Sequence, residues 1–379
     1  MSTLSMQTKC QKTTENLDNT TPWISFCVAT HKRPEILAKT LRSIQQQTIE
    51  NFEVIVSDND PEQSSRSVVD EIGDSRIHYF CNNENVGMVR NFNVALAHAK
   101  GSYVVLLADD DPPDANFLSE IHAIWIEYPS YGTYYGACEV LMEDPAAAAS
   151  YNSKVGSIEC LAAEPAGIIR CFSKNEFPVK YFKGEVFPYI LWSTGIVRRD
   201  IALEIGGMPD YGSPLLTDIS YIALTGAHSG CVTINKVLGR QVVHGANSGL
   251  TNPHNVEAAL NGSYQYMSHR FAKREDWLSV RQAMEKYLFT YTLTHSLAMN
   301  RYFSATKNKG EQRKLKQTIN EIAKLQFMHG LIFQFNWPIV NSIESVLRKC
   351  LYRLLTIKFI RRFSSSIKRV FRIENPFNL

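Results

Sequence analysis

Three consecutive carboxylates, Asp109, Asp110 and Asp111, are the residues of this chain best suited to chemistry. They follow residues 104–107, an apolar run typical of a strand buried on both faces, and the prolines at 112–113 prevent that strand from continuing. Open α/β sheets bind ligands at the carboxyl ends of their strands. Because adjacent negative charges repel one another, a hard divalent cation that joins them to a diphosphate would offset their cost. The alternative is an ordinary solvated turn before a helix.

The segments that must hold these carboxylates alternate between strand and helix patterns. We expect strands at residues 23–29, 52–57, 76–80 and 103–108, with helices between them at residues 34–44, 68–72 and 87–99. This alternation predicts an α/β domain with a parallel sheet and right-handed crossovers. Polar clusters follow the strands that end at Ala29, Ser57 and Ala108, so we expect them to lie along one rim of the sheet.

The second part of the chain is less regular. The pattern predicts a strand at 133–142, a loop at 143–157, a strand or extended segment at 187–197, helices at 199–205 and 217–224, and two short strands within 231–243. From about residue 253 onward the pattern is helical.

The composition is that of an ordinary globular protein. The 379 residues are 44% hydrophobic and 20% charged, and the net charge of +3 creates no strong overall field. No apolar run reaches the roughly 18–20 residues that span a bilayer, and the polar N-terminus lacks the apolar core of a signal peptide. The eight cysteines are scattered without zinc spacing, which indicates a reducing, cytoplasmic compartment.

Five motifs within residues 23–245 together resemble those of the family 2 glycosyltransferases of the GT-A fold. They are the segment Thr30-His-Lys-Arg-Pro34, the segments 41–48 and 52–59, the sequence Asn85-x-Gly87-x-x-Arg90-Asn91, the carboxylate-tipped strand 107–111, and Gly206-Gly207 followed eleven residues later by Asp218. Their order and spacing make the resemblance specific. It implies an α/β fold of the GT-A type, with a mixed, mostly parallel sheet flanked by helices, to which a helical C-terminal extension is added.

The resemblance implies a nucleotide-sugar donor, a divalent metal ion (Mg²⁺ or Mn²⁺) and transfer of one sugar to an acceptor hydroxyl. Asp58 maps onto a carboxylate that contacts the nucleobase, and Arg90 onto a fixed donor group near the diphosphate. The complete set that the resemblance assigns to the donor is Thr30, His31, Arg33, Asp58, Asn59, Gly87, Arg90, Asp109 and Asp110.

The metal would lie on Asp109, Asp110 and Asp111, with His244 as a further contact unless that histidine is structural. In many family members this motif is Asp-x-Asp-Asp, but the first position here is Ala108. We therefore expect Asp110 or Asp111 to be the direct metal ligand. Asp109 would contact the ribose or a metal-bound water.

Transfer to a hydroxyl requires a base, and Asp218 maps onto the general base of an inverting displacement. Its alternative role is to cap the helix at 217–224, and Asp210 is the reserve candidate for the base. Trp192 and Tyr211 are candidates for aromatic platforms in the acceptor site, although aromatic residues more commonly belong to the core.

The chain divides into four expected parts: a flexible leader at 1–21, a catalytic domain at 22–250, a helical extension at 251–330 and a basic amphipathic tail at 331–379. Between residues 348 and 372 the tail carries nine Lys or Arg and no Asp or Glu, with large apolar residues between them. This composition predicts contact with an anionic membrane, peripheral on the inner face of the cytoplasmic membrane. A helix that packs on the domain is the alternative, and no nucleic-acid motif accompanies the charge, so no nucleic-acid partner is expected.

The sequence thus predicts an inverting, metal-dependent glycosyltransferase that acts on a glycan, carried on a lipid, in the synthesis of O-antigen, capsule or another surface polysaccharide. A nucleotidyltransferase of similar fold is one alternative, but the loop at 30–34 lacks the glycines that such enzymes use. A non-catalytic protein that binds sugar nucleotides or serves as a membrane scaffold is the other.

Overall fold

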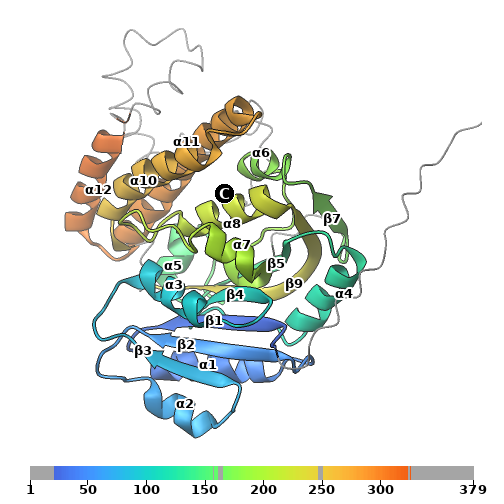
Figure 1. Ribbon diagram of the computed structural model, residues 1–379. Coiled ribbons are helices and arrows are strands. Elements are labelled where there is room, and N and C mark those ends of the chain that lie inside the picture. The colour runs from blue at the N-terminus through green and yellow to red at the C-terminus, as the bar shows by residue number, and fades with distance from the viewer. Residues whose placement is uncertain (1–20, 157, 161–164, 246–250, 323–324, 326–379) are drawn as a thin grey trace, which may run out of the picture.

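A nine-stranded mixed sheet forms the centre of the molecule, with the strand order β3-β2-β1-β4-β8-β5-β9-β7 and with β6 paired to β5. The computed structural model describes residues 21–156, 158–160, 165–245, 251–322 and 325. The expected leader (except residue 21) and the expected basic tail lie outside the described residues. Figure 1 places the helices α10–α12 at the opposite end of the molecule from β3 and α2.

The first four strands are parallel and match the expected positions within one residue. They are β1 (Ile24–Thr30), β2 (Phe52–Asp58), β3 (Ile77–Cys81) and β4 (Tyr103–Ala108). In the register, Thr30 lies opposite Asp58, and Ala29 lies opposite both Ser57 and Ala108. The polar clusters that follow these strands therefore share one edge of the sheet, as the sequence predicts.

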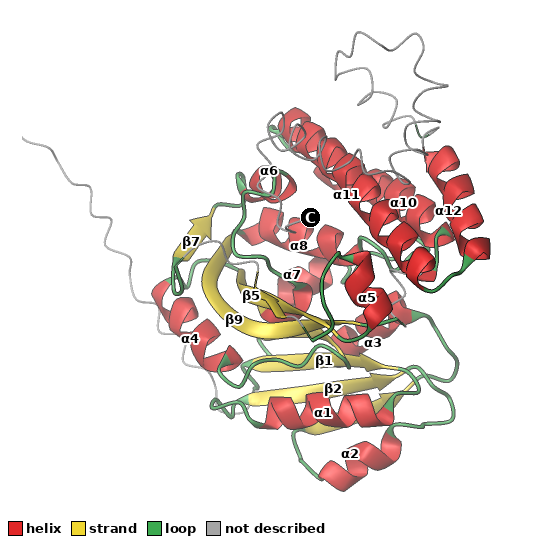
Figure 2. Cartoon of the chain, turned by 180° about the vertical axis from the view of Figure 1, so that it is seen from behind, coloured by secondary structure: helices red, strands yellow, loops and turns green. Residues whose placement is uncertain are grey.

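Helices cover both faces of this half of the sheet. The apolar side chains of α1 (Pro34–Gln45), α2 (Arg66–Ile72) and α4 (Phe117–Glu127) pack on one face. On the other face, α3 (Met88–His98), α7 (Arg199–Glu204) and α8 (Thr217–Ser229) share a core with α6 (Phe177–Phe182). Both views show this layered arrangement (Figures 1 and 2).

The second half of the sheet is mixed. β8 (Gly195–Arg198) is antiparallel to β4 and to β5 (Thr133–Met142), and β9 (Cys231–Val243) is parallel to β5. β6 (Ile158–Cys160) pairs with β5, and β7 (Ile169–Phe172) pairs with β9. Neither of these two short strands was expected from the sequence.

Three expectations for this region are wrong. The expected loop at 143–157 contains α5 (Pro145–Ser150), because Asp144 caps it by accepting hydrogen bonds from the backbone of Ala146 and Ala147 at 2.9 and 2.8 Å. The expected strand or extended segment at 187–197 is interrupted by a 3-10 turn over Trp192–Thr194 and is a strand only from residue 195. The two short strands expected at 231–243 are one strand, whose pairing with β5 shifts near Gly136.

The part that follows residue 253 is helical, as expected. Here α10 (His254–Phe271) packs on α8, α11 (Trp277–Ala305) packs on α5 and α6, and α12 (Lys309–Ile322) packs on α10 and α11. Among the described residues, no helix combines the length and the apolar character that a membrane crossing requires. The core that these helices form is continuous with the core beneath α3 and α8.

Candidate functional site

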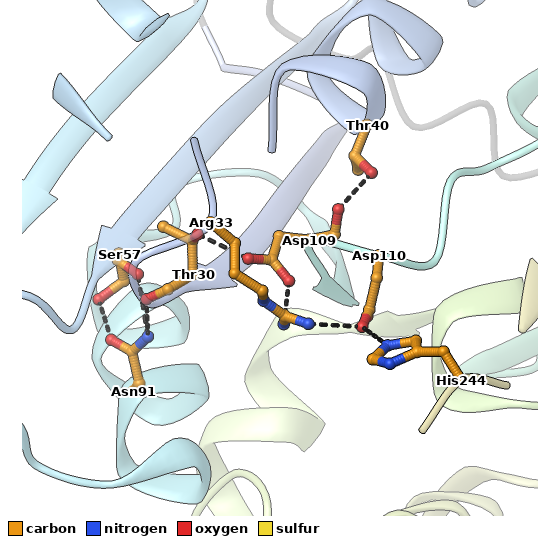
Figure 3. A network of polar contacts seen from close by, with 8 residues as sticks. All are labelled: Thr30, Arg33, Thr40, Ser57, Asn91, Asp109, Asp110 and His244. Carbon is orange, nitrogen blue, oxygen red and sulfur yellow. Dashed lines mark hydrogen bonds and ion pairs between the residues drawn. The ribbon is translucent and has the colours of Figure 1, made fainter. Parts of the chain in front are cut away.

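The expected carboxylate cluster lies at the end of β4, and Arg33 joins two of its members. Asp109 is fully buried, and one of its oxygens accepts a hydrogen bond from the Thr30 hydroxyl at 2.6 Å. The other oxygen accepts from the Arg33 guanidinium, which also donates to Asp110 at 2.7 Å. The ends of β1 and β4 are thus held together by a charged pair rather than by a solvated turn (Figure 3).

A second layer of polar contacts fixes this arrangement. The Thr40 hydroxyl on α1 donates to the backbone carbonyl of Asp109 at 2.6 Å. The Asn91 amide on α3 donates to the carbonyls of Ser57 and Thr30 at 2.9 and 3.3 Å, and it accepts from the Ser57 hydroxyl at 2.7 Å. Asn91 belongs to the motif seen in the sequence, but its role in tying β1 to β2 was not expected, and neither was Thr40.

His244, the further metal contact that the sequence suggests, also reaches the cluster. It follows β9, and its Nε2 lies 3.3 Å from the Asp110 carboxylate (Figure 3). The hydrogen bond to Asp110 raises the pKa of His244, although partial burial opposes the shift. Asp110 therefore lies between the guanidinium of Arg33 and the imidazole of His244, one from each half of the sheet.

The three carboxyls differ in their electrostatics. Burial raises the pKa of Asp109 to about 6, against the opposing effects of Arg33 and Thr30. Burial also acts on Asp110, but the hydrogen bonds and charges of His244 and Arg33 bring its pKa below the ordinary value. Asp111 is 6% exposed, and its pKa lies well above the ordinary value because of burial and the charge of Asp110.

The donor atoms fit a divalent cation by type, since they are carboxylate oxygens and one imidazole. Among the described residues, however, no three acidic, histidine or cysteine side chains are placed so that they could hold an ion together. The guanidinium of Arg33 instead lies against Asp109 and Asp110. The metal site expected at these carboxylates stays a prediction.

The polar cluster after β2 forms a second part of the rim. Asp58 is fully buried, and its carboxylate accepts hydrogen bonds from the Tyr79 hydroxyl at 2.8 Å and from the backbone of Asp60 and Ser65 at 3.0 and 3.2 Å. These donors occupy both carboxylate oxygens. In this arrangement Asp58 organises the loop after β2, and its expected contact with a nucleobase stays a prediction.

Asn59 connects this cluster to the loop before α3. Its side chain donates to Asn85 at 2.7 Å and accepts from the backbone of Val86 at 2.9 Å. His31, in the loop after β1, is exposed, and its Nε2 lies 3.3 Å from the Asn85 amide. Gly87 begins α3 with φ +85°, a conformation that favours glycine, and a side chain there would meet no atom within 4 Å.

Arg90 and Asp210, expected on the donor and acceptor sides respectively, form an ion pair. The Arg90 Nε lies 2.7 Å from the Asp210 carboxylate, and the Arg90 side chain is 71% exposed. This pair joins the start of α3 to the loop between α7 and α8. The two sides of the expected site therefore meet at one exposed contact.

Asp218 lies in the first turn of α8, directly after Leu216 and Thr217. Burial raises its pKa to about 6, although backbone N–H groups at the start of the helix favour the charged form. A carboxyl with this pKa is ionised at neutral pH and remains a better base than an exposed aspartate. Its role as the general base stays a prediction.

The two expected aromatic platforms have different surroundings. The Tyr211 hydroxyl donates to the carbonyl of Leu215 at 2.9 Å, and its ring lies 6.4 Å from that of Tyr266. Trp192 packs edge-on against Phe92 with ring centroids 6.2 Å apart. Trp192 is thus tied to the core, whereas Tyr211 borders a groove on α10.

The comparisons with known proteins agree with this geometry. Residues 25–152 match the family model described as glycosyl transferase family 2. A GalNAc(5)-diNAcBac-PP-undecaprenol β-1,3-glucosyltransferase of Campylobacter jejuni is 32% identical over 169 residues, which are 44% of this chain and 50% of the relative. The Escherichia coli β-1,3-glucosyltransferase WfaP, named for UDP-Glc and α-D-GlcNAc-diphosphoundecaprenol, is 31% identical over 30% of this chain and 46% of its own length. The chain thus spans half or less of these two relatives.

Solved structures extend the likeness of the fold beyond the matched segment. Staphylococcus aureus TarS 1-349 superposes with a TM-score of 0.53 at 14% identity, over 79% of this chain and 80% of TarS. Its complex with UDP-GlcNAc superposes equally well, at 15% identity. Residues 25–152 of this chain are thus similar to glycosyl transferase family 2, and its sheet has the GT-A fold.

Proposed function

We propose that this protein is an inverting, metal-dependent glycosyltransferase that moves a sugar from a nucleotide-sugar donor to a hydroxyl of a lipid-linked glycan. The observation that carries the proposal is the partly buried cluster of Asp109, Asp110, Arg33 and His244 at the carboxyl edge of the sheet. This cluster combines the acidic and basic groups that a metal and a diphosphate require. It begins inside the segment that matches the family.

The donor would lie along the rim from β2 to β4. Thr30, Arg33 and Asp109 would face the ribose and diphosphate, and Arg90 would turn from Asp210 towards the phosphates. Asp110 and Asp111, with His244, would hold the divalent ion after their side chains rearrange, because they are not placed to hold one together here. When bound, such an ion neutralises the negative charge that develops on the departing nucleoside diphosphate.

The acceptor reaction would be carried by Asp218. The acceptor hydroxyl gives its proton to this carboxylate as its oxygen attacks the anomeric carbon, the bond from that carbon to the diphosphate oxygen breaks, and the configuration inverts. The rim of the donor site and the segment before Asp218 are joined by the contact between Arg90 and Asp210. Both substrates would therefore meet beside this loop.

Two of the relatives are named for glucosyl transfer to diphosphoundecaprenol-linked acceptors, and a third is named as a succinoglycan biosynthesis protein. We take UDP-glucose as the first donor to test and a GlcNAc-diphosphate lipid as the first acceptor. A place on the inner face of the cytoplasmic membrane would follow from such an acceptor and from the basic composition of residues 348–372. The product would enter the synthesis of a surface polysaccharide.

Thermal unfolding with and without Mn²⁺ tests donor binding, using UDP-glucose, UDP-GlcNAc and GDP-mannose. One of them should raise the midpoint only when the metal is present, and its sugar should then be transferred to a GlcNAc-diphosphate that carries a short alkyl chain. Binding without turnover under all conditions would favour the non-catalytic alternative. Release of pyrophosphate from a nucleoside triphosphate and a sugar phosphate would favour the nucleotidyltransferase.

A further inference from the structure

Five tyrosines lie within electrostatic reach of Asp218, and they come from four separate segments of the chain. We name them the tyrosine cluster: Tyr181 on α6, Tyr189 before the 3-10 turn, Tyr211 in the loop before α8, and Tyr287 and Tyr291 on α11. In each of them burial is the main cause of a raised pKa, and the negative charge of Asp218 raises it further. The candidate base therefore lies within electrostatic reach of all five phenols.

The packing of the helices supports this placement. α6, which carries Tyr181, packs on α8, which carries Asp218, and also on α11, which carries Tyr287 and Tyr291. Each of the five tyrosines is partly buried and keeps part of its area exposed to solvent.

Three of the hydroxyls are available for a ligand. Among the described residues, the hydroxyls of Tyr181, Tyr287 and Tyr291 have no hydrogen-bond partner. A tyrosine hydroxyl in a buried setting usually finds one. Their partner is therefore expected to be water or a bound molecule.

The rings themselves are held in place by aromatic neighbours. Tyr181 stacks on Phe177 with centroids 5.4 Å apart, and Tyr291 stacks on His295 at 4.9 Å. Tyr287 lies tilted against Phe182 at 5.7 Å. Tyr287 and Tyr291 are four residues apart on α11, so they lie on one face of that helix. These three rings are thus held in position before any ligand binds.

We propose that Tyr181, Tyr287 and Tyr291 form, with Asp218, the binding site for the terminal sugar of the acceptor, and that this sugar is uncharged. The inference rests on the proposed function, in which Asp218 is the base. Aromatic faces suit the apolar faces of a sugar ring, and phenol hydroxyls suit its hydroxyl groups. The carboxylate of Asp218 would repel an acidic sugar.

Tyr211 links the proposed site to a second feature. It borders an open groove of about 610 Å³ on α10, which Asn261, Gln265, Tyr266 and Arg270 also line. The volume lies within the range of small-molecule sites, about 300–1,000 Å³. This groove provides room for sugar units behind the one that reacts.

The inference makes the helical part of the chain responsible for acceptor choice. Tyr181, Tyr287 and Tyr291 all lie beyond residues 25–152, the segment that matches the family. The proposed donor site would follow the family pattern, whereas the proposed acceptor site would be particular to this chain.

Tyr287→Phe and Tyr291→Phe test the inference, with UDP-glucose as donor and GlcNAc-diphosphate on a short alkyl chain as acceptor. Each change removes one hydroxyl and keeps the ring, so the KM for the acceptor should rise about 2- to 10-fold while the affinity for UDP-glucose holds. The unfolding midpoint should not fall, because neither hydroxyl has a partner among the described residues. An acceptor that ends in a uronic acid should compete at least about tenfold less well.

Tyr264→Phe is the matched control, because its hydroxyl donates to Glu285 on α11 at 2.9 Å. This change should lower the unfolding midpoint and leave the acceptor KM unaltered. If Tyr287→Phe and Tyr291→Phe leave the acceptor KM of an active enzyme unchanged, or lower the midpoint as the control does, the cluster is a packing feature and the inference is wrong. A parent protein that binds no nucleotide sugar defeats the proposed function itself, and the inference with it.

Discussion

Replacement of Asp218 by asparagine should increase the stability of the protein while it removes the activity. Burial raises the pKa of Asp218 from 3.8 to about 6. One pKa unit corresponds to about 1.4 kcal/mol, so this shift of about 2 units costs the folded protein at most about 3 kcal/mol when the group is ionised. Asp218 keeps partial exposure, so we expect a stability gain of about 1–3 kcal/mol from its neutral counterpart.

The sign depends on pH. The folded pKa lies above the unfolded value, so between about pH 4 and pH 6 the folded protein binds more protons than the unfolded one, and its stability falls as pH rises. The penalty is complete above pH 6 and largely absent at pH 4. Asp218→Asn should therefore be more stable than the parent at pH 7.5 and no more stable at pH 4.

Activity should change in the opposite direction. Asparagine can still accept backbone hydrogen bonds at the start of α8, but it cannot take a proton, so turnover should fall by about 10² or more while donor affinity holds. In the parent, kcat/KM should rise through about pH 6, where Asp218 loses its proton. Urea unfolding at the two pH values, together with turnover and donor titration, measures all of these quantities.

Asp200→Asn is the matched control. Asp200 lies in the first turn of α7, and although burial opposes it, its ion pair with Arg198 lowers its pKa. Loss of this charge should therefore slightly reduce stability at pH 7.5, opposite to the effect at Asp218. If Asp218→Asn also lowers stability at pH 7.5, Asp218 is a charged helix cap and the reasoning from burial is refuted.

Three other outcomes follow from the contacts of the site. Asp111→Asn should raise the unfolding midpoint, because Asp111 is buried beside two carboxyls. Asp110→Asn should lower the midpoint, because Arg33 and His244 lose a partner. Both changes should abolish Mn²⁺-dependent donor binding, and normal binding by both variants would refute the metal site. Arg90→Ala should weaken UDP-glucose binding about tenfold in calorimetry with little change in stability, because the pair with Asp210 is exposed; unchanged affinity would remove Arg90 from the donor site. Removal of residues 346–379 should abolish salt-sensitive sedimentation with anionic vesicles, since each basic residue near the membrane surface contributes on the order of 1 kcal/mol to binding. Equal sedimentation of the full-length and truncated proteins would refute the membrane assignment.

The half of the fold that carries the proposed donor site could be predicted because its signals are local. Residues 104–107 are apolar and end at carboxylates and prolines, so both the strand and its end are visible in the sequence. In the second half the signals conflict with simple patterns. Pro188 lies within the expected strand at 187–197, and the Asp144-Pro145 start of α5 was hidden by a run of alanines without helical periodicity.

The candidate residues of the site can be named from the sequence, but their contacts cannot. The types and motifs of Asp109, Asp110, Arg33 and His244 predict them as site residues, and the structure brings them together. However, Arg33 is 76 residues from Asp109, and His244 is 134 residues from Asp110, so nothing local indicates that Arg33 bridges two carboxylates or that His244 faces the second. The tyrosine cluster has no motif at all, because four distant segments supply it.

The continuous core bears on the division of the chain at residue 250. Val256, Leu260 and Met267 of α10 and Met284 and Leu288 of α11 are completely buried in the same core as α3 and α8. Each fully buried side chain of this kind contributes about 1.5–3 kcal/mol, and a typical protein has a net stability of only about 5–15 kcal/mol. A chain that ends at residue 250 should therefore fail to fold, whereas one that ends at residue 345 should unfold cooperatively and still bind UDP-glucose. Circular dichroism melting of both truncated forms measures this, and a cooperative transition in the shorter one would show that residues 22–250 form an independent domain.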